Sequence, residues 1–176
     1  MKIWRIYPHE RYGELAMKEI DLDYLHSFDG RSKKEGWAPP ETMPYDRCKL
    51  GNITDFEGIL TLDKIALESL KDLIGNNAEI LPIYYNDKEF YLINVIKFVD
   101  VINFEKSKYK SLSNGKIVVF DNYVLDKTMI ADNDIFKMKG DAPIVDVVSD
   151  RFKQRVEEKR LTGVGFRLVW DSEAQE

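Results

Sequence analysis

The sequence is poor in the residues that form disulfides or bind transition metals. Its 176 residues include one cysteine, Cys48, and two histidines, His9 and His26. A single cysteine excludes a disulfide within the chain and is typical of a reducing compartment. A structural zinc site needs several cysteine or histidine ligands at close spacing, and these are missing. We therefore expect a protein that folds without disulfides, metal or other cofactor.

Long apolar runs are also missing. The most hydrophobic stretch, from Phe90 to Phe104, is shorter than the roughly 20 residues that span a bilayer. It also contains Asn94, Lys97 and Asp100. This stretch is therefore predicted to be a core strand, with Lys97 pointing its charge outward along an apolar stem. We expect no contact with a membrane.

The N-terminal segment "MKIWRIYPHERYG" lacks the apolar stretch of a secretory signal. Arginine, proline and histidine interrupt its apolar residues. Together with the single cysteine, this pattern favours a cytoplasmic protein.

Basic residues are fewer than acidic residues along the whole chain. The sequence has 26 lysines and arginines against 31 acidic residues, a net charge of −5. Residues 1–60 hold 9 basic and 11 acidic side chains, residues 61–140 hold 11 and 12, and residues 141–176 hold 6 and 8. Because nucleic-acid binding needs a basic stripe, direct contact with nucleic acid is not expected. A basic protein partner fits the balance better.

Periodicity predicts two principal helices. In the segment 61–77, Thr61 can cap the N-terminus, Asp63 falls in the first turn and Gly75 provides the stop. A second helix is predicted from a Ser149 cap to about Arg160. The cap position explains Ser149 better than a nucleophile does, because no G-x-S-x-G elbow surrounds it.

Six segments are predicted to be strands, and a hairpin is expected at the Asn86-Asp87 turn. Pro82 places the first strand of that hairpin towards an edge, and the second should be central. A long loop of about residues 26–50, rich in proline, should be pinned to the core by Trp37. The predicted fold is α+β, with a mainly antiparallel sheet and two principal helices in a single domain, residues 1–176, that ends in an acidic tail, 171–176. The predicted strands are residues 2–7, 79–85, 89–99, 116–125, 134–139 and 162–170.

The sequence contains little that indicates catalysis. It has no phosphate loop of the G-x-x-x-x-G-K-[ST] kind. Asp21, Asp23 and His26 could hold a metal for a hydrolase, or they could form the polar face of a loop or helical turn whose Leu22 and Leu25 face inward. Flanking cations could likewise lower the pKa of the lone cysteine, although no histidine lies beside it in sequence.

Several blocks occur in the order seen in a bacterial protein family: "FDG" (28–30), "W-x-P" (37–39), "GILTLDKIALESLKDLIG" (58–75), "EILPIYY" (79–85), "EFYLINVIKFVDVINFEKS" (89–107), "DIFKM" (134–138) and "SDRFKQRVEEKRLTGVGF" (149–166). The sequence resembles the immunity proteins of polymorphic toxin systems, a family first catalogued from a Myxococcus protein and formerly a domain of unknown function. Its pattern after the central strand is aspartate, two apolar residues and aspartate; here it is "DVIN", so Asp100 is kept and Asn103 takes the second place. A role that needs two carboxylates is in doubt, but turn capping by hydrogen bonds is not. Asn94 and Asp100 are predicted to organise the exit of the strand.

The resemblance implies a protein without enzymatic activity that binds and neutralises a cognate toxin encoded by a neighbouring gene. Toxins of these systems are often nucleases with basic clefts, so occlusion of the active site or of an adjacent surface by an acidic partner is the expected mechanism. An interaction domain of a secretion apparatus is the other binding role left open, and the sequence does not distinguish a monomer from a dimer. The predicted toxin-contact residues are Tyr45, Asp46, Asp55, Glu57, Asp132 and Asp134.

Overall fold

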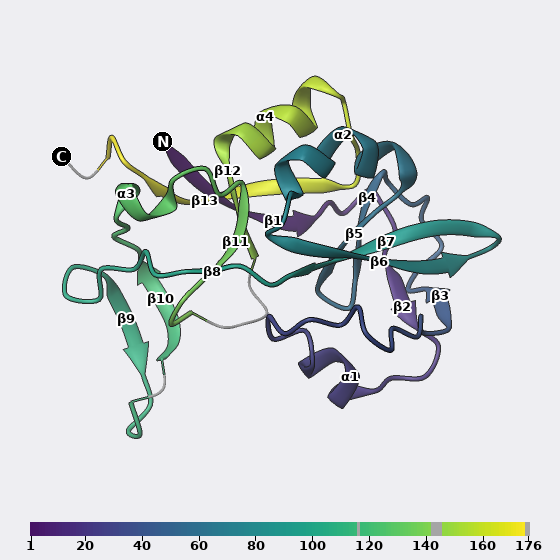
Figure 1. The fold of residues 1–176 in the computed structure, drawn as a ribbon, viewed down its shortest axis with the longest axis horizontal. Helices are drawn as coiled ribbons and strands as arrows, with labels where there is room; N and C mark the ends of the chain where they lie inside the picture. The colour runs from purple at the N-terminus through teal and green to yellow at the C-terminus, as the bar shows by residue number, and fades with distance from the viewer. Residues whose placement is uncertain (116, 142–145, 175–176) are drawn as a thin grey trace.

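The computed structural model describes residues 1–115, 117–141 and 146–174, and in these the chain is an α+β fold built on three sheets (Figure 1). Most neighbouring strands are antiparallel, as predicted. Two pairs in the described part are parallel, β2 with β4 and β8 with β11. The mixed α and β class is thus confirmed, although the strands divide among separate sheets instead of forming one.

The largest sheet has six strands in the order β3-β2-β4-β5-β7-β6. The prediction that Pro82 belongs to an edge strand is confirmed, since β6 is the last strand. Thr42 of β3 donates to the carbonyl oxygen of Tyr84 in β6, so the two outer strands of this sheet meet. Its strands are β2 (Leu15–Met17), β3 (Thr42–Pro44), β4 (Ile53–Phe56), β5 (Ile59–Leu62), β6 (Ala78–Tyr85) and β7 (Lys88–Val95).

A second sheet has five strands in the order β13-β1-β12-β11-β8, and a third is the two-stranded hairpin of β9 and β10. The predicted first and last strands pair with each other from Lys2↔Asp171 to Pro8↔Val164, with a register shift between Ile3 and Trp4. The hairpin projects from the body beside α3 (Figure 1). Of the strand predicted over 116–125, β10 covers part and residue 116 lies outside the described residues. The strands are β1 (Lys2–Pro8), β8 (Phe98–Val99), β9 (Lys108–Ser111), β10 (Ile117–Asn122), β11 (Ile135–Met138), β12 (Asp146–Ser149) and β13 (Val164–Asp171).

The most apolar segment of the chain connects the two large sheets. The predicted strand 89–99 is interrupted, because the backbone N–H groups of Ile96 and Lys97 both donate to the carbonyl oxygen of Asn77, at 2.9 and 3.0 Å. Up to Val95 the segment pairs within the six-stranded sheet, and as β8 it joins the five-stranded sheet. Lys97 is exposed, as predicted.

Both predicted helices are present, α2 (Lys64–Ile74) and α4 (Asp150–Glu158). Ser149 caps α4 as expected, accepting from the Phe152 N–H at 3.1 Å. The predicted Thr61 cap of α2 is wrong. Thr61 lies in β5, and Asp63 caps the helix through its side chain, 2.8 Å from the Ala66 nitrogen. Two short helices are also present. The segment of α1 (Leu22–His26) was expected to be a loop or a helical turn, and α3 (Lys127–Ile130) was not predicted, so the described residues form four helices and not two.

The long connection between α1 and β4 is anchored to the six-stranded sheet. Trp37 packs on that sheet and its indole N–H donates to the Pro82 carbonyl oxygen at 2.9 Å, which confirms the prediction that it pins the loop. The short strand β3 forms within this connection, paired with β2. Because Trp37 binds to the edge strand β6, the connection covers an edge that would otherwise be open.

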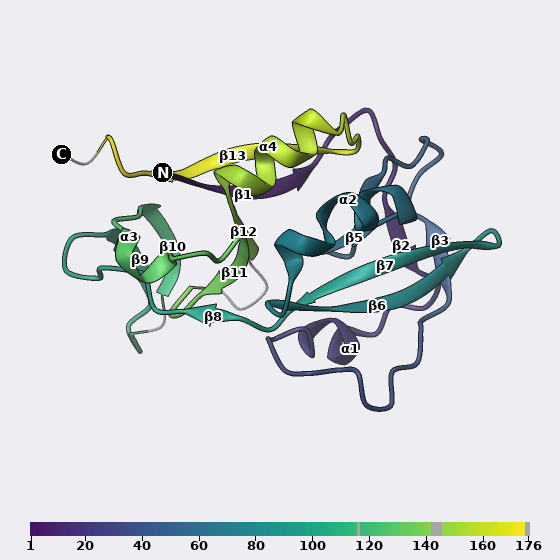
Figure 2. The ribbon, with the colours of Figure 1, turned by 45° about the horizontal axis from the view of Figure 1, so that its top comes forward.

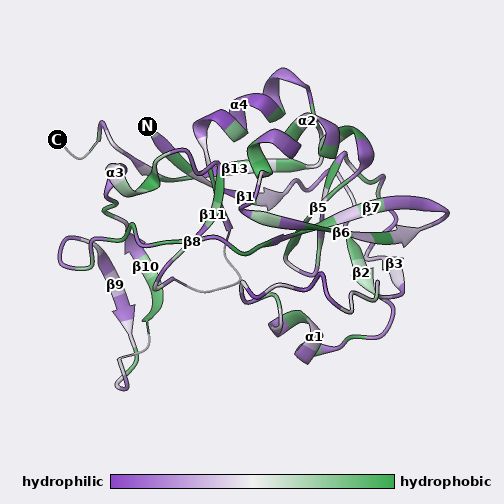
Figure 3. Cartoon of the chain, viewed as in Figure 1, coloured by the Kyte–Doolittle hydropathy of each residue, from purple (hydrophilic) through white to green (hydrophobic). Residues whose placement is uncertain are grey.

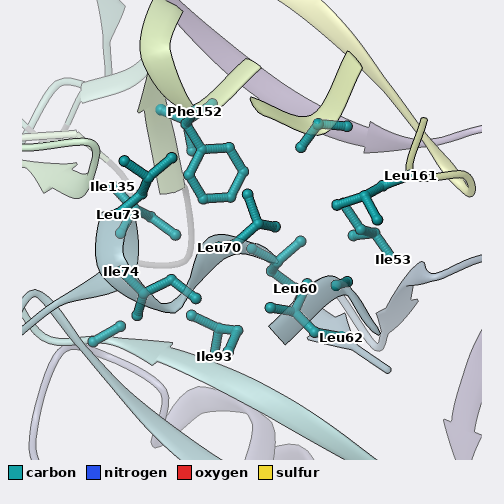
Figure 4. Packing of buried hydrophobic residues seen from close by; sticks show 14 of the residues in the cluster. Ile53, Leu60, Leu62, Leu70, Leu73, Ile74, Ile93, Ile135, Phe152 and Leu161 are labelled. Carbon is teal, nitrogen blue, oxygen red and sulfur yellow. The ribbon is translucent and has the colours of Figure 1, made fainter. Parts of the chain in front are cut away.

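One apolar core fills the space between the two large sheets and the two longer helices. Phe152 of α4 points towards Leu70 and Leu73 of α2, with Ile135 of β11 and Ile93 of β7 around them (Figure 4). Figure 2 shows the two helices running over the sheets side by side. Each large side chain buried here stabilises the fold by about 1.5–3 kcal/mol. Hydrophilic residues alternate with hydrophobic ones along both helices, as a one-sided covering requires (Figure 3).

Of the predicted acidic tail, residues 171–174 belong to the described part of the chain. Asp171 ends β13, and its carboxylate lies 3.4 Å from the Lys2 ammonium group. The Ser172 N–H donates to the Met1 carbonyl oxygen at 2.9 Å, so the two ends of the described chain lie together. Residues 175–176 of the predicted tail lie outside the described residues.

A close backbone approach fixes the start of the last strand. Gly163 has a φ of +109°, and a Cβ atom there would meet the carbonyl oxygen of Ile53. The Ile53 N–H in turn donates to the Thr162 carbonyl oxygen at 2.9 Å. We expect Gly163→Ala to lower the free energy of unfolding by about 3 kcal/mol or more, since it adds a clash to an unfavourable φ.

Urea denaturation measures this effect, and Gly36→Ala is the matched control. Gly36 also has a positive φ, +73°, but nothing lies within 4 Å of a Cβ added there. It should cost only about 1–2 kcal/mol. Equal losses in the two variants would show that the Gly163 contact does not constrain the fold.

Candidate functional site

Charged side chains gather where the two large sheets face each other. Lys137 of β11 donates to Asp146 of β12 at 2.7 Å, and the two residues are direct cross-strand partners. The lysine side chain is 4% exposed and the aspartate 17%. Burial raises the pKa of Asp146 to about 6, even though the charge of Lys137 opposes the shift. The pair is therefore largely removed from water and links β11 to β12.

A second polar cluster links β1 to the segment that follows β10. Arg5 donates to the Tyr123 hydroxyl at 2.5 Å and to the Asp141 carboxylate at 2.8 Å. Tyr123 also donates to Asp141 at 2.7 Å. Burial, and then the hydrogen bond to Asp141, raise the pKa of Tyr123. This cluster fastens three separate segments together.

The third cluster involves Asn94, one of the polar residues in the apolar run. Glu79 of β6 is 4% exposed and accepts from Ser32 Oγ at 2.5 Å, from the Lys33 N–H at 2.7 Å and from Asn94 Nδ2 at 3.0 Å. Burial alone would raise the pKa of Glu79, but these hydrogen bonds outweigh it and lower the pKa. Asn94 Nδ2 also donates to the Arg31 carbonyl oxygen at 2.9 Å. Asn94 thus anchors the long connection and does not organise the strand exit.

Asp100 and Asn103, the polar residues that follow the central strand in the family pattern, lie near the surface. Asp100 is exposed and accepts from Lys139 at 3.2 Å. Asn103, which replaces the second carboxylate of the family pattern, accepts from the Lys106 N–H at 3.1 Å. The predicted hydrogen-bonding role in a turn is therefore confirmed for Asn103.

The residues of the hydrolase hypothesis lie on α1. Asp21 caps this helix, its Oδ1 3.0 Å from the Tyr24 nitrogen, while Asp23 and His26 lie in its first and last turns. Within the described ranges, no group of three or more His, Cys, Asp or Glu could hold a metal ion. The geometry therefore favours the polar helical turn, although Leu22 is 61% exposed and does not face inward as expected.

Four of the six predicted toxin-contact residues lie on the six-stranded sheet. Tyr45, 73% exposed, and Asp46 follow β3, and Asp46 accepts from the Cys48 N–H at 2.8 Å. Asp55 is the last but one residue of β4, and it accepts from the Gly58 N–H at 2.7 Å. Glu57 forms the tight turn to β5 with a φ of +53°. These residues share the rim of one sheet.

Asp132 and Asp134 lie elsewhere, between α3 and β11. Asp132 is exposed, but the prediction that Asp134 is an exposed acid is wrong. Asp134 is 4% exposed and accepts from Ser149 Oγ at 2.5 Å and from Arg151 Nε at 3.0 Å. Its partners lie 15 and 17 residues away, at the start of α4, which a local reading of the sequence does not reveal.

The β9–β10 hairpin carries exposed apolar residues that sequence reasoning did not select. Tyr109, Leu112, Val118 and Val119 are between 40% and 62% exposed; together they are called the hairpin patch below. The base of the hairpin is anchored by Phe120, which stacks on the ring of Tyr123 at 4.5 Å. In the sequence, these apolar residues stand among several lysines, and this pattern could have indicated an exposed strand pair.

No helix in the described part is long and apolar enough to cross a membrane. A family model described as "Immunity protein family (Imm11)" matches residues 84–171, from the end of β6 to the end of β13. The chain belongs to this family. Membership indicates immunity against a toxin and suggests a non-catalytic role for the protein. No curated protein matches the chain.

The family match covers half of the chain, less than the whole-length resemblance expected from the sequence blocks. It includes the hairpin patch and the segment with Asp132 and Asp134. It excludes Tyr45, Asp46, Asp55 and Glu57, the four predicted contact residues on the rim of the six-stranded sheet.

The buried position of Asp134 gives a direct test of its role. Asp134→Ala removes the acceptor for Ser149 and Arg151 at the start of α4, so it should lower the free energy of unfolding by about 2–4 kcal/mol. Asp132→Ala, two residues away and exposed, should change it by less than about 0.5 kcal/mol. Urea denaturation of both variants provides the comparison. Wild-type stability in Asp134→Ala would contradict the structural role.

Asp55 should make stability depend on pH. Burial raises its pKa to about 6, and Glu14 and Glu57 add to the shift. Because the folded state holds this proton more tightly than the unfolded chain, Asp55 lowers stability above pH 6 and not below about pH 4. Asp55→Asn keeps the acceptor for Gly58 and should raise the free energy of unfolding by about 1–3 kcal/mol at pH 7.5.

Urea denaturation between pH 4 and 8 measures this gain, which should fade as the pH falls from 6 to 4. Asp132→Asn is the control, because that exposed side chain should give no gain above about 0.5 kcal/mol at any of these pH values. A gain from Asp55→Asn that is the same at pH 4 and pH 7.5 would contradict a raised pKa.

Proposed function

We propose that this protein protects the cytoplasm of the cell that makes it by binding one cognate toxin, encoded by a neighbouring gene, and covering its active site. The family match over residues 84–171 carries the proposal. We further propose that the toxin is a nuclease. The net charge of −5 supports this, since a basic nuclease cleft attracts an acidic partner.

The contact surface we propose is the acidic rim, defined as Glu41, Met43, Tyr45, Asp46 and Tyr84. Met43, Tyr45 and Tyr84 are 42%, 73% and 54% exposed. Of the two carboxylates, Glu41 pairs with Lys18 at 2.8 Å, and Asp46 accepts from the Cys48 N–H at 2.8 Å. Aromatic side chains concentrate binding energy in interfaces, and carboxylates speed association with a basic partner. Asp55 and Glu57 remain proposed contacts at the periphery, Asp132 remains a proposed contact on a separate part of the surface, and Asp134 is withdrawn because it is buried.

Four of the five rim residues lie outside the family match, which begins at Tyr84, and this position agrees with the proposed role. A surface that must distinguish one toxin from others is expected to differ among family members, because specificity depends on contacts particular to each pair. The shared part of the fold, by contrast, includes most of the five-stranded sheet and α4. In this proposal that part keeps the rim rigid, and the single chain acts as one domain.

Binding must be tight for the proposal to hold. A dissociation constant between nanomolar and picomolar corresponds to about 12–16 kcal/mol. Interfaces of roughly 1,600 Å² with a few desolvated anchors reach such values. Exposed aromatic residues on an anchored loop can supply these anchors.

The test is co-expression with the C-terminal domain of the protein encoded next to this gene. Wild-type protein should rescue growth, and Tyr45→Ala should raise the dissociation constant at least about 30-fold, as loss of an anchor does. Asp46→Asn should mainly slow association and reduce its dependence on salt. Surface-immobilised toxin domain and a series of salt concentrations measure both rates.

Val118→Ser in the hairpin patch is the matched control. It replaces an apolar side chain with 62% exposure far from the rim, and should leave both rates unchanged. Loss of binding in Val118→Ser with wild-type binding in Tyr45→Ala would place the contact on the hairpin. Cell death despite soluble wild-type protein, or a turnover activity in purified protein, would contradict the proposal itself.

A further inference from the structure

A cavity of about 210 Å³ lies between the two large sheets, where α1 and the turn between β4 and β5 face β7, β11 and β12. Its polar lining residues in the described part are His26, Glu57, Asn94, Lys137 and Asp146. The remaining wall is largely apolar, as is usual for sites that bind small molecules. The apolar side chains are Leu22, Leu25, Phe28, Ile59, Ile93 and Val95.

One of the residues that line the cavity has a polar atom without a partner. Asn94 is 1% exposed, and its Nδ2 is fully used by Glu79 and the Arg31 carbonyl oxygen. Its Oδ1 is buried and accepts no hydrogen bond. A buried acceptor without a donor is costly, and native proteins rarely keep one. A guest that donates to Asn94 would remove this cost.

The charges around the cavity favour a neutral guest. Lys137 and Asp146 already neutralise each other at 2.7 Å. Because these two charges compensate each other, neither is free to pair with an ionic guest, and burying an unpaired ion beside the apolar wall would be costly. The size also restricts the guest, since an apolar cavity of about 150 Å³ holds benzene. The larger volume here suits a ring system of one or two fused rings.

We propose that this cavity binds a neutral, flat ring that donates one hydrogen bond to Asn94 Oδ1, as an indole or a phenol does. Two sources share this chemistry: a free small molecule, or a tryptophan or tyrosine side chain of the partner protein. The first source is independent of the immunity function, whereas the second rests on it.

Indole and indene are the probes, because they have nearly the same shape and only indole has an N–H group. Calorimetric titration of the full chain should show indole binding about 3- to 10-fold more tightly than indene, the range expected for one hydrogen bond. In Asn94→Ala this preference should disappear while both probes still bind. Equal affinities in the wild type, or no binding of either probe, would overturn the proposal.

The second experiment fills the cavity with a larger side chain. Leu25→Trp places a large ring on the wall and should abolish indole binding, and Leu22→Trp, from a position already 61% exposed, should weaken it at least 10-fold. Ile65→Trp is the control, because Ile65 is 64% exposed on α2 and does not line the cavity. Circular dichroism confirms that each variant is folded. Folded Leu25→Trp and Leu22→Trp with wild-type affinity for indole would show that the ring binds elsewhere.

The partner toxin distinguishes the two sources. If a side chain of the toxin occupies the cavity, saturation with toxin should block indole, and Leu25→Trp should weaken toxin binding. If the ligand is a free molecule, the toxin complex should bind indole as the free protein does. Indole binding without any protection from the toxin would contradict the proposed immunity function and leave the cavity assignment standing.

Discussion

The arrangement of this molecule depends on an apolar core that neither large sheet can form alone. Ile93 and Val95 come from the six-stranded sheet, Ile135 and Val148 from the five-stranded one, and Phe152 from α4 closes the space between them. The chain passes between the sheets immediately after Val95, where two N–H groups bind the Asn77 carbonyl oxygen. A break in this core would therefore separate the sheets and disrupt the surfaces that each presents.

Buried polar residues supplement this core in a way that accounts for the polar interruptions of its most apolar segment. Asn94 and Glu79 hold the long connection, and Lys137 pairs with Asp146 across two strands. Each of these charges is satisfied by an opposite charge or by several donors, as buried charges must be. Their partners are structural neighbours, which is the arrangement expected of a rigid binding protein.

The sequence was informative where structure follows from local pattern. The 3.6-residue periodicity and the caps located α2 and α4, and β-branched residues located the first and last strands. The sequence was not informative where an element or a side chain depends on partners that are distant along the chain. Ile53–Phe56 and Ile59–Leu62 are too short to be distinguished from a buried turn, and the positive φ of Glu57 between them has no clear residue signal. The candidate residues show the same limit: Tyr45 is exposed as expected, whereas the polar surroundings of Asp134 concealed partners that reach it only through the fold.

The long connection explains how a segment rich in loops can present a binding surface. A free loop of this length would lose much conformational entropy when a partner ordered it, and this loss would reduce the affinity. Here Trp37 is tied to Pro82, Glu79 binds Ser32 and the Lys33 N–H, and Thr42 reaches the end of β6. These hydrogen bonds order the connection before any partner arrives. The acidic rim at its end is therefore presented in a fixed shape, as the proposed contact with a toxin requires.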